Sequence, residues 1–334
     1  MSSNPRLSVL VVACERPHLL QRVLEDLTQQ SLPSSDFEVI VSDDGSHPTL
    51  ESLLGHFSQK LQLSWIWGER RGPATARNRA LESLHAPLTL FLNDDVSLAP
   101  NLLEQHLVLH ARQHKPTAIM GTFHFPDDIR ADLFHRVVED MGLIGTKCMK
   151  PGIPLPGSMF WTGNLSLPTK ALQAVEGFDE DFREPKGDDV DLGIRLLREE
   201  HLQLIFSEEA VSWHHHTFTT EQWWDRAQMV GRAQRLLAHK HQDPTFWPGG
   251  TEIMLSPAKA RTTKARTLAQ RPIARGLQKW VDQLVAGTLP PGTYEIPELD
   301  CSMRLPEQTE ALLTAAVVAA THFLFQEAFW ETEV

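Results

Sequence analysis

The first third of the chain alternates between short apolar runs and segments with helical spacing. Strands are predicted at Leu7–Ala13, Phe37–Val41, Leu61–Trp67 and Pro87–Leu92. Helices are predicted between them, from Pro17 to Leu27 and from Pro73 to Leu84. Strands that alternate with helices of this length form a mostly parallel sheet with helices on both faces. The predicted fold class is therefore α/β.

After about Gly121 the alternation loosens. Helical spacing returns at Asp188–Glu199, Glu221–Lys240 and Glu307–Trp330. We expect a domain boundary near residue 240, with a first domain at 1–240 and a mainly helical C-terminal extension at 241–334. The stretch from Gly142 to Gly157 is rich in glycine and proline, which is typical of an irregular segment. It is a candidate lid that orders when a ligand binds.

Charge and cysteine usage restrict the function classes. The net charge of −12 argues against a surface that binds nucleic acid by neutralising phosphates. Three scattered cysteines favour a reducing compartment over a disulfide framework. No signal peptide is recognisable, and the apolar run Leu312–Phe325 looks too short to span a bilayer. These features predict a cytoplasmic protein, and peripheral membrane association stays open.

Acidic pairs follow two of the predicted strands. Asp43-Asp44 comes after the second strand, and Asp94-Asp95 follows the strand that ends at Leu92. Ligands of open α/β sheets bind beyond the carboxyl ends of the strands, so one site can hold both pairs. Carboxylates suit a hard divalent cation. Each pair alone is equally consistent with a turn or a helix cap.

Basic and histidine residues supply further candidates. Arg77, on the first turns of a predicted helix, can meet a carboxylate or phosphate in bidentate fashion. For Arg79 we expect a solvated helical face. His214-His215-His216 follows a strand-like segment, and without spatial context a structural role is favoured.

Taken in order, these segments resemble the family 2 glycosyltransferases, which have the GT-A, Rossmann-like fold of nucleotide-diphospho-sugar transferases. The similarity covers about residues 7 to 240. The matching pieces are Val9-Leu10-Val11-Val12 with Arg16-Pro17, Val41-Ser42-Asp43-Asp44-Gly45-Ser46, Ala76-Arg77-Asn78, Phe91-Leu92-Asn93-Asp94-Asp95, Thr162-Gly163-Asn164-Leu165-Ser166, Gly177-Phe178-Asp179-Glu180, and the segment Gly187 to Leu196.

The resemblance implies a donor site for a nucleotide sugar, most often UDP-linked, although GDP and dTDP stay open. Asp43 would pair with the nucleobase, Arg77 would hold the donor or its partner carboxylates, and Asp94 would face the ribose or sugar. The full donor-binding set is Ala13, Glu15, Arg16, Asp43, Asp44, Arg77, Asn93 and Asp94. Asp95 and His214 would bind Mn²⁺ or Mg²⁺ on the diphosphate, with His216 as the alternative histidine.

The resemblance also implies an inverting reaction in which Asp189 is the general base for an acceptor hydroxyl. The acceptor side would include Trp161, Gly163, Asn164 and Asp188. The acceptor could be a glycan, a lipid-linked sugar or a small molecule. Two departures from the family pattern are Asn93, often an Asp, and Asp188-Asp189, usually Glu-Asp. Both make the identity of the donor less certain.

Other interpretations compete with this one. A non-catalytic nucleotide-sugar or glycan-binding module on the same fold is the main alternative. Nucleotidyl transfer and dehydrogenase activity are disfavoured, because no glycine-rich loop follows the first strand.

Structural roles are predicted for most of the remaining aromatic and basic residues. Of Trp223 and Trp224, one is expected in a core, and the other stays open as a residue of the acceptor cleft. The basic residues Lys259, Arg261, Lys264, Arg266 and Arg271 suggest a solvated helical face. The C-terminal helix suggests packing or a homo-oligomer contact.

Overall fold

The computed structural model describes residues 4–147, 149–246, 263–265, 267, 269–288, 292–296, 301–305 and 309–332. The chain divides into two compact units. The first comprises Met1–Pro126 and Gly145–His216, and the second comprises Asp127–Ile144 and Thr217–Val334. By this division the helix that begins at Thr220 belongs to the second unit, whereas the predicted boundary near residue 240 would leave it in the first.

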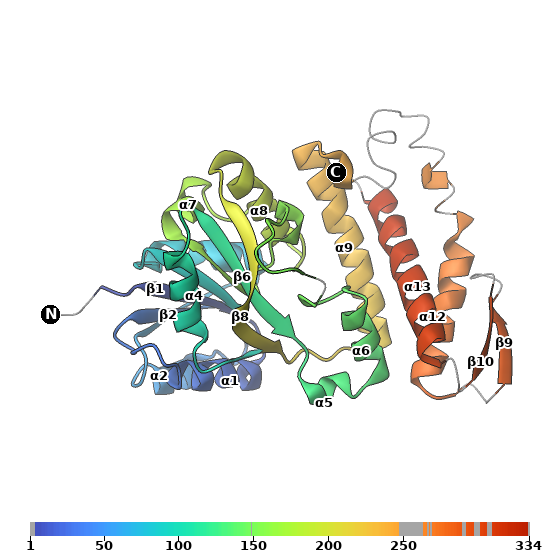
Figure 1. Cartoon of the computed structure of the whole chain (residues 1–334), viewed down its shortest axis with the longest axis horizontal. Helices are drawn as coiled ribbons and strands as arrows, with labels where there is room; N and C mark the ends of the chain where they lie inside the picture. The colour runs from blue at the N-terminus through green and yellow to red at the C-terminus, as the bar shows by residue number, and fades with distance from the viewer. Residues whose placement is uncertain are drawn as a thin grey trace. The chain divides into compact units, whose positions relative to one another are not determined.

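The first unit alternates strands and helices along most of its length (Figure 1). Its strands are β1 (Leu7–Ala13), β2 (Phe37–Asp44), β3 (Leu63–Gly68), β4 (Leu88–Asn93), β5 (Val96–Leu98), β6 (Thr117–His124), β7 (Asn164–Pro168) and β8 (Gln203–His214). Its α-helices are α1 (Pro17–Thr28), α2 (Glu51–Phe57), α3 (Pro73–Arg79), α4 (Leu102–Ala111), α7 (Thr169–Ala174) and α8 (Asp188–Glu199).

These strands form an eight-stranded sheet in the order β3-β2-β1-β4-β7-β6-β8-β5. Strands β3, β2, β1 and β4 run parallel to one another, and β6 is parallel to β8. Strand β7 is antiparallel to β4 and β6, and the short β5 is antiparallel to β8. The α/β prediction is confirmed.

Helices cover both faces of the sheet because the central strands are apolar on both sides. One core lies under α1, α2 and α4 and takes alternate residues of β1, including Leu7, Val9 and Val11. The other lies under α3, α7 and α8 and takes Leu10, together with Phe91 of β4. With both faces buried, the carboxyl ends of the strands are the part of this sheet that remains for binding a ligand.

The described part of the second unit is mainly helical, as predicted for the C-terminal region. Its helices are α5 (Asp127–Arg130), α6 (Leu133–Asp140), α9 (Thr220–His241), α12 (Arg271–Val285) and α13 (Thr309–Glu331). Figure 1 shows α9, α13 and α12 running side by side, and α13 packs against both of the others. A short antiparallel hairpin of β9 (Gly292–Ile296) and β10 (Cys301–Leu305) was not predicted.

Helix α9 has a well-defined start and a close neighbour. The Thr219 hydroxyl accepts from the Gln222 backbone N–H, and the Gln222 side chain accepts from the Thr219 backbone N–H, which is a capping box. Further along, a Cβ added at Gly231 would collide with the Phe325 backbone carbonyl of α13. The glycine therefore allows the two helix backbones to approach each other closely.

The two tryptophans of α9 are both core residues. Trp223 is 3% exposed and Trp224 is 6% exposed. Their indole N–H groups donate to Thr321 Oγ1 at 2.9 Å and to Asp282 Oδ1 at 3.4 Å, within the second unit. The core role expected for one of the two is confirmed, and the tryptophan whose role was left open is buried as well.

Helix α13 corrects one expectation about length. It has 23 residues and is long and apolar enough to cross a membrane, whereas the apolar run alone looked too short. A buried helix of a soluble core meets the same criteria, and Leu313, Val317 and Leu324 of α13 are buried.

Of the predicted basic residues, Arg271 pairs with Glu327 and Glu331, while Lys259, Arg261 and Arg266 lie outside the described residues.

Candidate active site

The candidate site is built where β1, β2, β4 and β8 end. Asp94 and Asp95 form the turn between β4 and β5, and β5 pairs with the end of β8 so that Val96 lies opposite His214. The carbonyl oxygen of Asp95 accepts the backbone N–H of His215 at 2.7 Å. This pairing fixes the acidic turn against the three consecutive histidines.

Arg16, which directly precedes α1, bridges both carboxylates of the turn. One guanidinium nitrogen donates to Asp95 Oδ2 at 2.8 Å, and the other donates to Asp94 Oδ1. The side chains of Asp94 and Asp95 are 2% and 5% exposed, whereas that of Arg16 is 37% exposed. The arginine thus reaches over two buried carboxylates from the surface.

Asp95, His214 and His216 meet the geometric requirement for a metal site. One ligand atom from each lies within 4.8 Å of the others. His214 Nε2 is 3.3 Å from Asp95 Oδ1, and His216 Nδ1 is 3.4 Å from Asp95 Oδ2. Among the described residues, Asp94 Oδ2 is buried without a hydrogen-bond partner, while Asp95 Oδ1 is buried beside the His214 ring nitrogen. Buried oxygens of this kind are costly, so the residues present fit a divalent cation.

The two carboxylates of the turn have different pKa values. Burial favours the neutral form of Asp95, but His214, His216 and Arg16 together outweigh it and hold its pKa well below the ordinary value. For Asp94, burial raises the pKa to about 7; Arg16 opposes the increase, and the charge of Asp95 adds to it. At neutral pH Asp95 is therefore ionised, as a metal ligand needs to be.

The acidic pair at the end of β2 separates into two roles. Asp43 is buried, and its Oδ1 accepts the Ser46 N–H at 2.9 Å. The two oxygens of Asp44 accept the backbone N–H groups of Arg71 and Gly72, each at 3.0 Å. Asp44 therefore holds the loop before α3, and its contact with a donor stays a prediction.

The remaining predicted donor residues line the loops around this pair. Ala13 ends β1 and is 1% exposed. Glu15 is exposed and pairs with Arg70 at 3.2 Å.

Arg79, expected on a solvated face, instead donates to the carbonyls of Asp43 and Glu69, each at 3.2 Å. That expectation is wrong, since this arginine ties α3 to the ends of β2 and β3.

The acidic pair that begins α8 is held from α3. Asp188 is buried and forms an ion pair with Arg77, whose guanidinium also lies over the Phe178 ring, 5.1 Å from its centroid. Burial raises the pKa of Asp189 to about 6, and the neighbouring charge of Asp188 adds to the increase. Arg77 was predicted to hold either the donor or its partner carboxylates. The ion pair with Asp188 is a contact with such a carboxylate.

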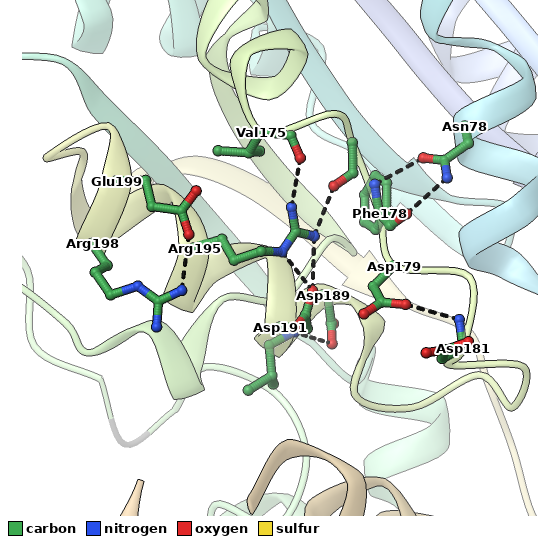
Figure 2. Close-up of polar contacts among 12 residues, drawn as sticks. Asn78, Val175, Phe178, Asp179, Asp181, Asp189, Asp191, Arg195, Arg198 and Glu199 are labelled. Carbon is green, nitrogen blue, oxygen red and sulfur yellow. Dashed lines mark hydrogen bonds and ion pairs between the residues drawn. The ribbon is translucent and has the colours of Figure 1, made fainter. Parts of the chain in front are cut away.

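Helix α8 and the preceding loop are locked together by Arg195 (Figure 2). Its guanidinium donates to Asp191 Oδ2 and to the carbonyls of Val175 and Gly177, each at 2.8 Å. On the other side of the loop, the Asn78 side chain exchanges two hydrogen bonds with the Phe178 backbone. The start of α8, where Asp189 lies, is therefore anchored on both sides.

Asn164, predicted on the acceptor side, is instead part of the protein interior. It is fully buried, and its amide nitrogen donates to the carbonyls of Thr122 and Ala210 and to Ser212 Oγ. Its amide oxygen contacts His106 Nε2 at 2.8 Å. The prediction is corrected, because every polar atom of this side chain is used to join β7 to β6, β8 and α4.

The other acceptor-side candidates lie close to the acidic turn or the core. The Asn93 N–H donates to the Gly163 carbonyl at 3.3 Å, and a Cβ at Gly163 would press against the Phe123 ring. Trp161 is half-buried against the core under α8. The candidate lid contacts β8, since the Leu155 N–H donates to the Leu204 carbonyl at 2.8 Å. Contact of Trp161 or Gly163 with an acceptor stays a prediction.

Sequence reasoning listed His216 only as an alternative and did not identify Arg195 or His106. For His216 the signal was present, because alternate residues of an extended segment share a face. The partners of Arg195 are mostly backbone carbonyls, which leave no trace in a residue pattern. His106 lies on α4, and its contacts with Asn164 and Ser166 join residues 58 and 60 positions apart in the sequence, which no local pattern indicates.

Known glycosyltransferases are similar to this chain in sequence. Residues 8–162 match the model of Glycosyl transferase family 2. The chain is 32% identical over 220 residues to validoxylamine A glucosyltransferase of Streptomyces hygroscopicus subsp. limoneus. The matched region covers 58% of this chain and 48% of that protein. The chain is 27% identical over 223 residues to hyaluronan synthase of Pasteurella multocida, covering 58% and 23%. The chain thus spans about half the length of the first of these relatives.

Solved structures with a similar fold cover nearly the whole chain. The mannosyltransferase PcManGT of Pyrobaculum calidifontis, in complex with GDP-Man and Mn²⁺, has a TM-score of 0.56 and 20% identity, covering 96% of this chain and 88% of that one. S. aureus TarS 1–349, in complex with UDP, has a TM-score of 0.53 and 15% identity, covering 97% and 90%. At these identities the likeness concerns the fold.

Proposed function

We propose, from the match of residues 8–162 to the model of Glycosyl transferase family 2, that the protein is an inverting, metal-dependent glycosyltransferase. It moves a sugar from a nucleoside-diphosphate donor to an acceptor hydroxyl. The single observation that carries the proposal is the cluster of Asp95, His214 and His216 at the strand ends, in which one ligand atom of each residue lies within 4.8 Å of the others.

The donor lies across the ends of β1, β2 and β4 in this proposal. Asp43, at the end of β2, faces the nucleobase, and Arg16 and Asp94 lie toward the diphosphate and sugar. A UDP-sugar is the leading donor, supported by the family and by the UDP complex of the fold relative TarS; the GDP-Man complex of PcManGT keeps GDP as the alternative. The names of two relatives mention validoxylamine A and hyaluronan, and the acceptor stays open among a glycan, a lipid-linked sugar and a small molecule.

The cation would be held by Asp95 and His214, with His216 as a third ligand. When bound, it supplies positive charge that stabilises the leaving diphosphate. Imidazole nitrogens are more typical ligands of transition metals than of Mg²⁺. This donor set therefore favours Mn²⁺ over Mg²⁺.

Asp189 is the general base of the proposed reaction. Its carboxylate accepts the proton of the acceptor hydroxyl while the hydroxyl oxygen attacks the anomeric carbon opposite the leaving diphosphate. The in-line geometry inverts the configuration of that carbon. A pKa of about 6 leaves Asp189 ionised at neutral pH and yet more basic than an ordinary carboxylate.

A donor assay tests the proposal. Purified protein is incubated with UDP-, GDP- and dTDP-sugars, with Mn²⁺, Mg²⁺ or a chelator, and release of the nucleoside diphosphate is measured. We expect one donor class to react only with divalent metal, and Asp95→Ala to abolish the release. Asp36→Ala, a change before the amino end of β2, is the control and retains activity. Metal-independent turnover, or full activity of Asp95→Ala, would overturn the proposal.

A further inference from the structure

Arg16 binds the same carboxylate that the proposed cation needs. Its guanidinium donates to Asp95 Oδ2 at 2.8 Å, and the same nitrogen lies 3.4 Å from His216 Nδ1. Asp95 and His216 are two members of the candidate metal cluster. A cation bound to these two residues would therefore sit next to the guanidinium or displace it.

Two cations in this position repel each other strongly. The carboxylates of Asp94 and Asp95 are almost fully buried, and the attraction or repulsion of charges is much greater in such surroundings than in water. Displacement is also costly, because Arg16 would give up charge-assisted bonds to both carboxylates. In either case Arg16 lowers the affinity of the site for a cation that arrives alone.

A diphosphate changes this balance. It offers Arg16 pairs of anionic oxygens, which a guanidinium fork can bind in bidentate fashion as it binds carboxylates. The Arg16 side chain is 37% exposed, and it directly precedes α1 rather than lying within it. The exposed part of the arginine side chain can therefore turn toward a ligand at the surface, while both carboxylates lie almost fully buried.

We propose that Arg16 exchanges between the carboxylates of Asp94 and Asp95 and the diphosphate of the donor, so that cation and diphosphate bind with positive cooperativity. The inference rests on the proposed function for the identity of the two ligands. It makes Arg16 the residue through which binding of the cation and binding of the diphosphate affect each other. By linkage, the diphosphate raises cation affinity by the same factor as the cation raises diphosphate affinity.

Binding measurements on the whole chain test this without turnover. Mn²⁺ affinity is measured alone by paramagnetic resonance titration, and UDP and GDP affinities are measured by calorimetry with and without saturating Mn²⁺. In Arg16→Gln we expect Mn²⁺ alone to bind about tenfold more tightly than in wild type. The factor by which Mn²⁺ improves nucleotide binding should fall by a similar amount, while part of it remains from direct attraction between the two ligands.

Two further variants separate geometry from charge. Arg22→Gln removes a positive charge from an exposed position on α1 and should leave both affinities unchanged. Arg16→Lys keeps the charge but cannot bridge two carboxylates, so its Mn²⁺ affinity should be intermediate. If circular dichroism shows that Arg16→Gln does not fold, Arg16→Lys takes its place in the binding measurements.

The outcomes distinguish this inference from the proposed function. If folded Arg16→Gln binds Mn²⁺ alone no more tightly than wild type, the exchange of Arg16 is wrong while the metal site stands. If Arg16→Gln is not folded and Arg16→Lys behaves as wild type, the exchange is again wrong. If wild type binds no Mn²⁺ either with or without UDP or GDP, the proposed function fails, and the coupling fails with it.

Discussion

The carboxylate of Asp189 lies at the first turn of α8, beside Asp188 and close to the Arg195 anchor. As the proposed base it acts only when ionised, so its raised pKa sets the pH range of the reaction. We expect the rate of transfer to rise with pH through about 6 and to level off above pH 7. A pH profile of kcat measures this.

Asp189→Asn removes the base but keeps the size of the side chain. General base catalysis contributes roughly 10²- to 10⁴-fold, so kcat should fall by that order, with a smaller effect on donor affinity. Glu199→Gln, an exposed change on the same helix, is the matched control. Full transfer activity in Asp189→Asn would remove Asp189 from the mechanism.

Individual residues show where sequence reasoning ends. Asp95 and His214 were predicted from motif order, and the structure brings them together. Asp44 and Asn164 belong to equally recognisable motifs, yet their polar atoms are used by backbone groups of Arg71, Thr122 and others. A motif shows that a polar residue is needed, but it does not show whether the partner is a ligand or the protein itself.

At the scale of elements, strands and helices were predictable where local signals were strong. The bounds of α8 follow from its apolar spacing and from Gly187, which adopts a φ of 89° just before the helix. The β9–β10 hairpin was missed because it is short and lies among prolines and glycines. Strand order was only partly predictable, since β5 and β7 join the sheet through long-range pairing.

The packing of α9 against α13 leads to a prediction about two helical glycines. Gly231→Ala would push a Cβ into the Phe325 backbone and should lower the free energy of unfolding by about 1–3 kcal/mol. At Gly55 of α2, an added Cβ meets nothing within 4 Å, so Gly55→Ala should raise stability by roughly 0.5–1 kcal/mol. Urea unfolding checks both. Equal stability of Gly231→Ala and wild type would contradict the close approach of the helices.

For the whole molecule, sequence patterns indicated two parts but not their composition. Asp127–Ile144 belongs to the second unit although β6 before it and β7 after it are in the first. No local pattern reveals such an excursion, because it depends on which helices pack together after folding. The role of the second unit stays open, and a homo-oligomer contact through α13 stays a prediction.

The central claim is that the strand-end site binds a nucleotide sugar together with a divalent metal. A thermal-shift screen of nucleotide sugars with and without Mn²⁺ tests it most directly, because a ligand at about 100 times its Kd adds roughly 2.7 kcal/mol to stability. We predict that one nucleotide class raises Tm by several degrees, that the rise needs Mn²⁺, and that it is lost in Asp95→Asn. No shift with any nucleotide sugar in the presence of Mn²⁺, or an equal shift in Asp95→Asn, would contradict the account.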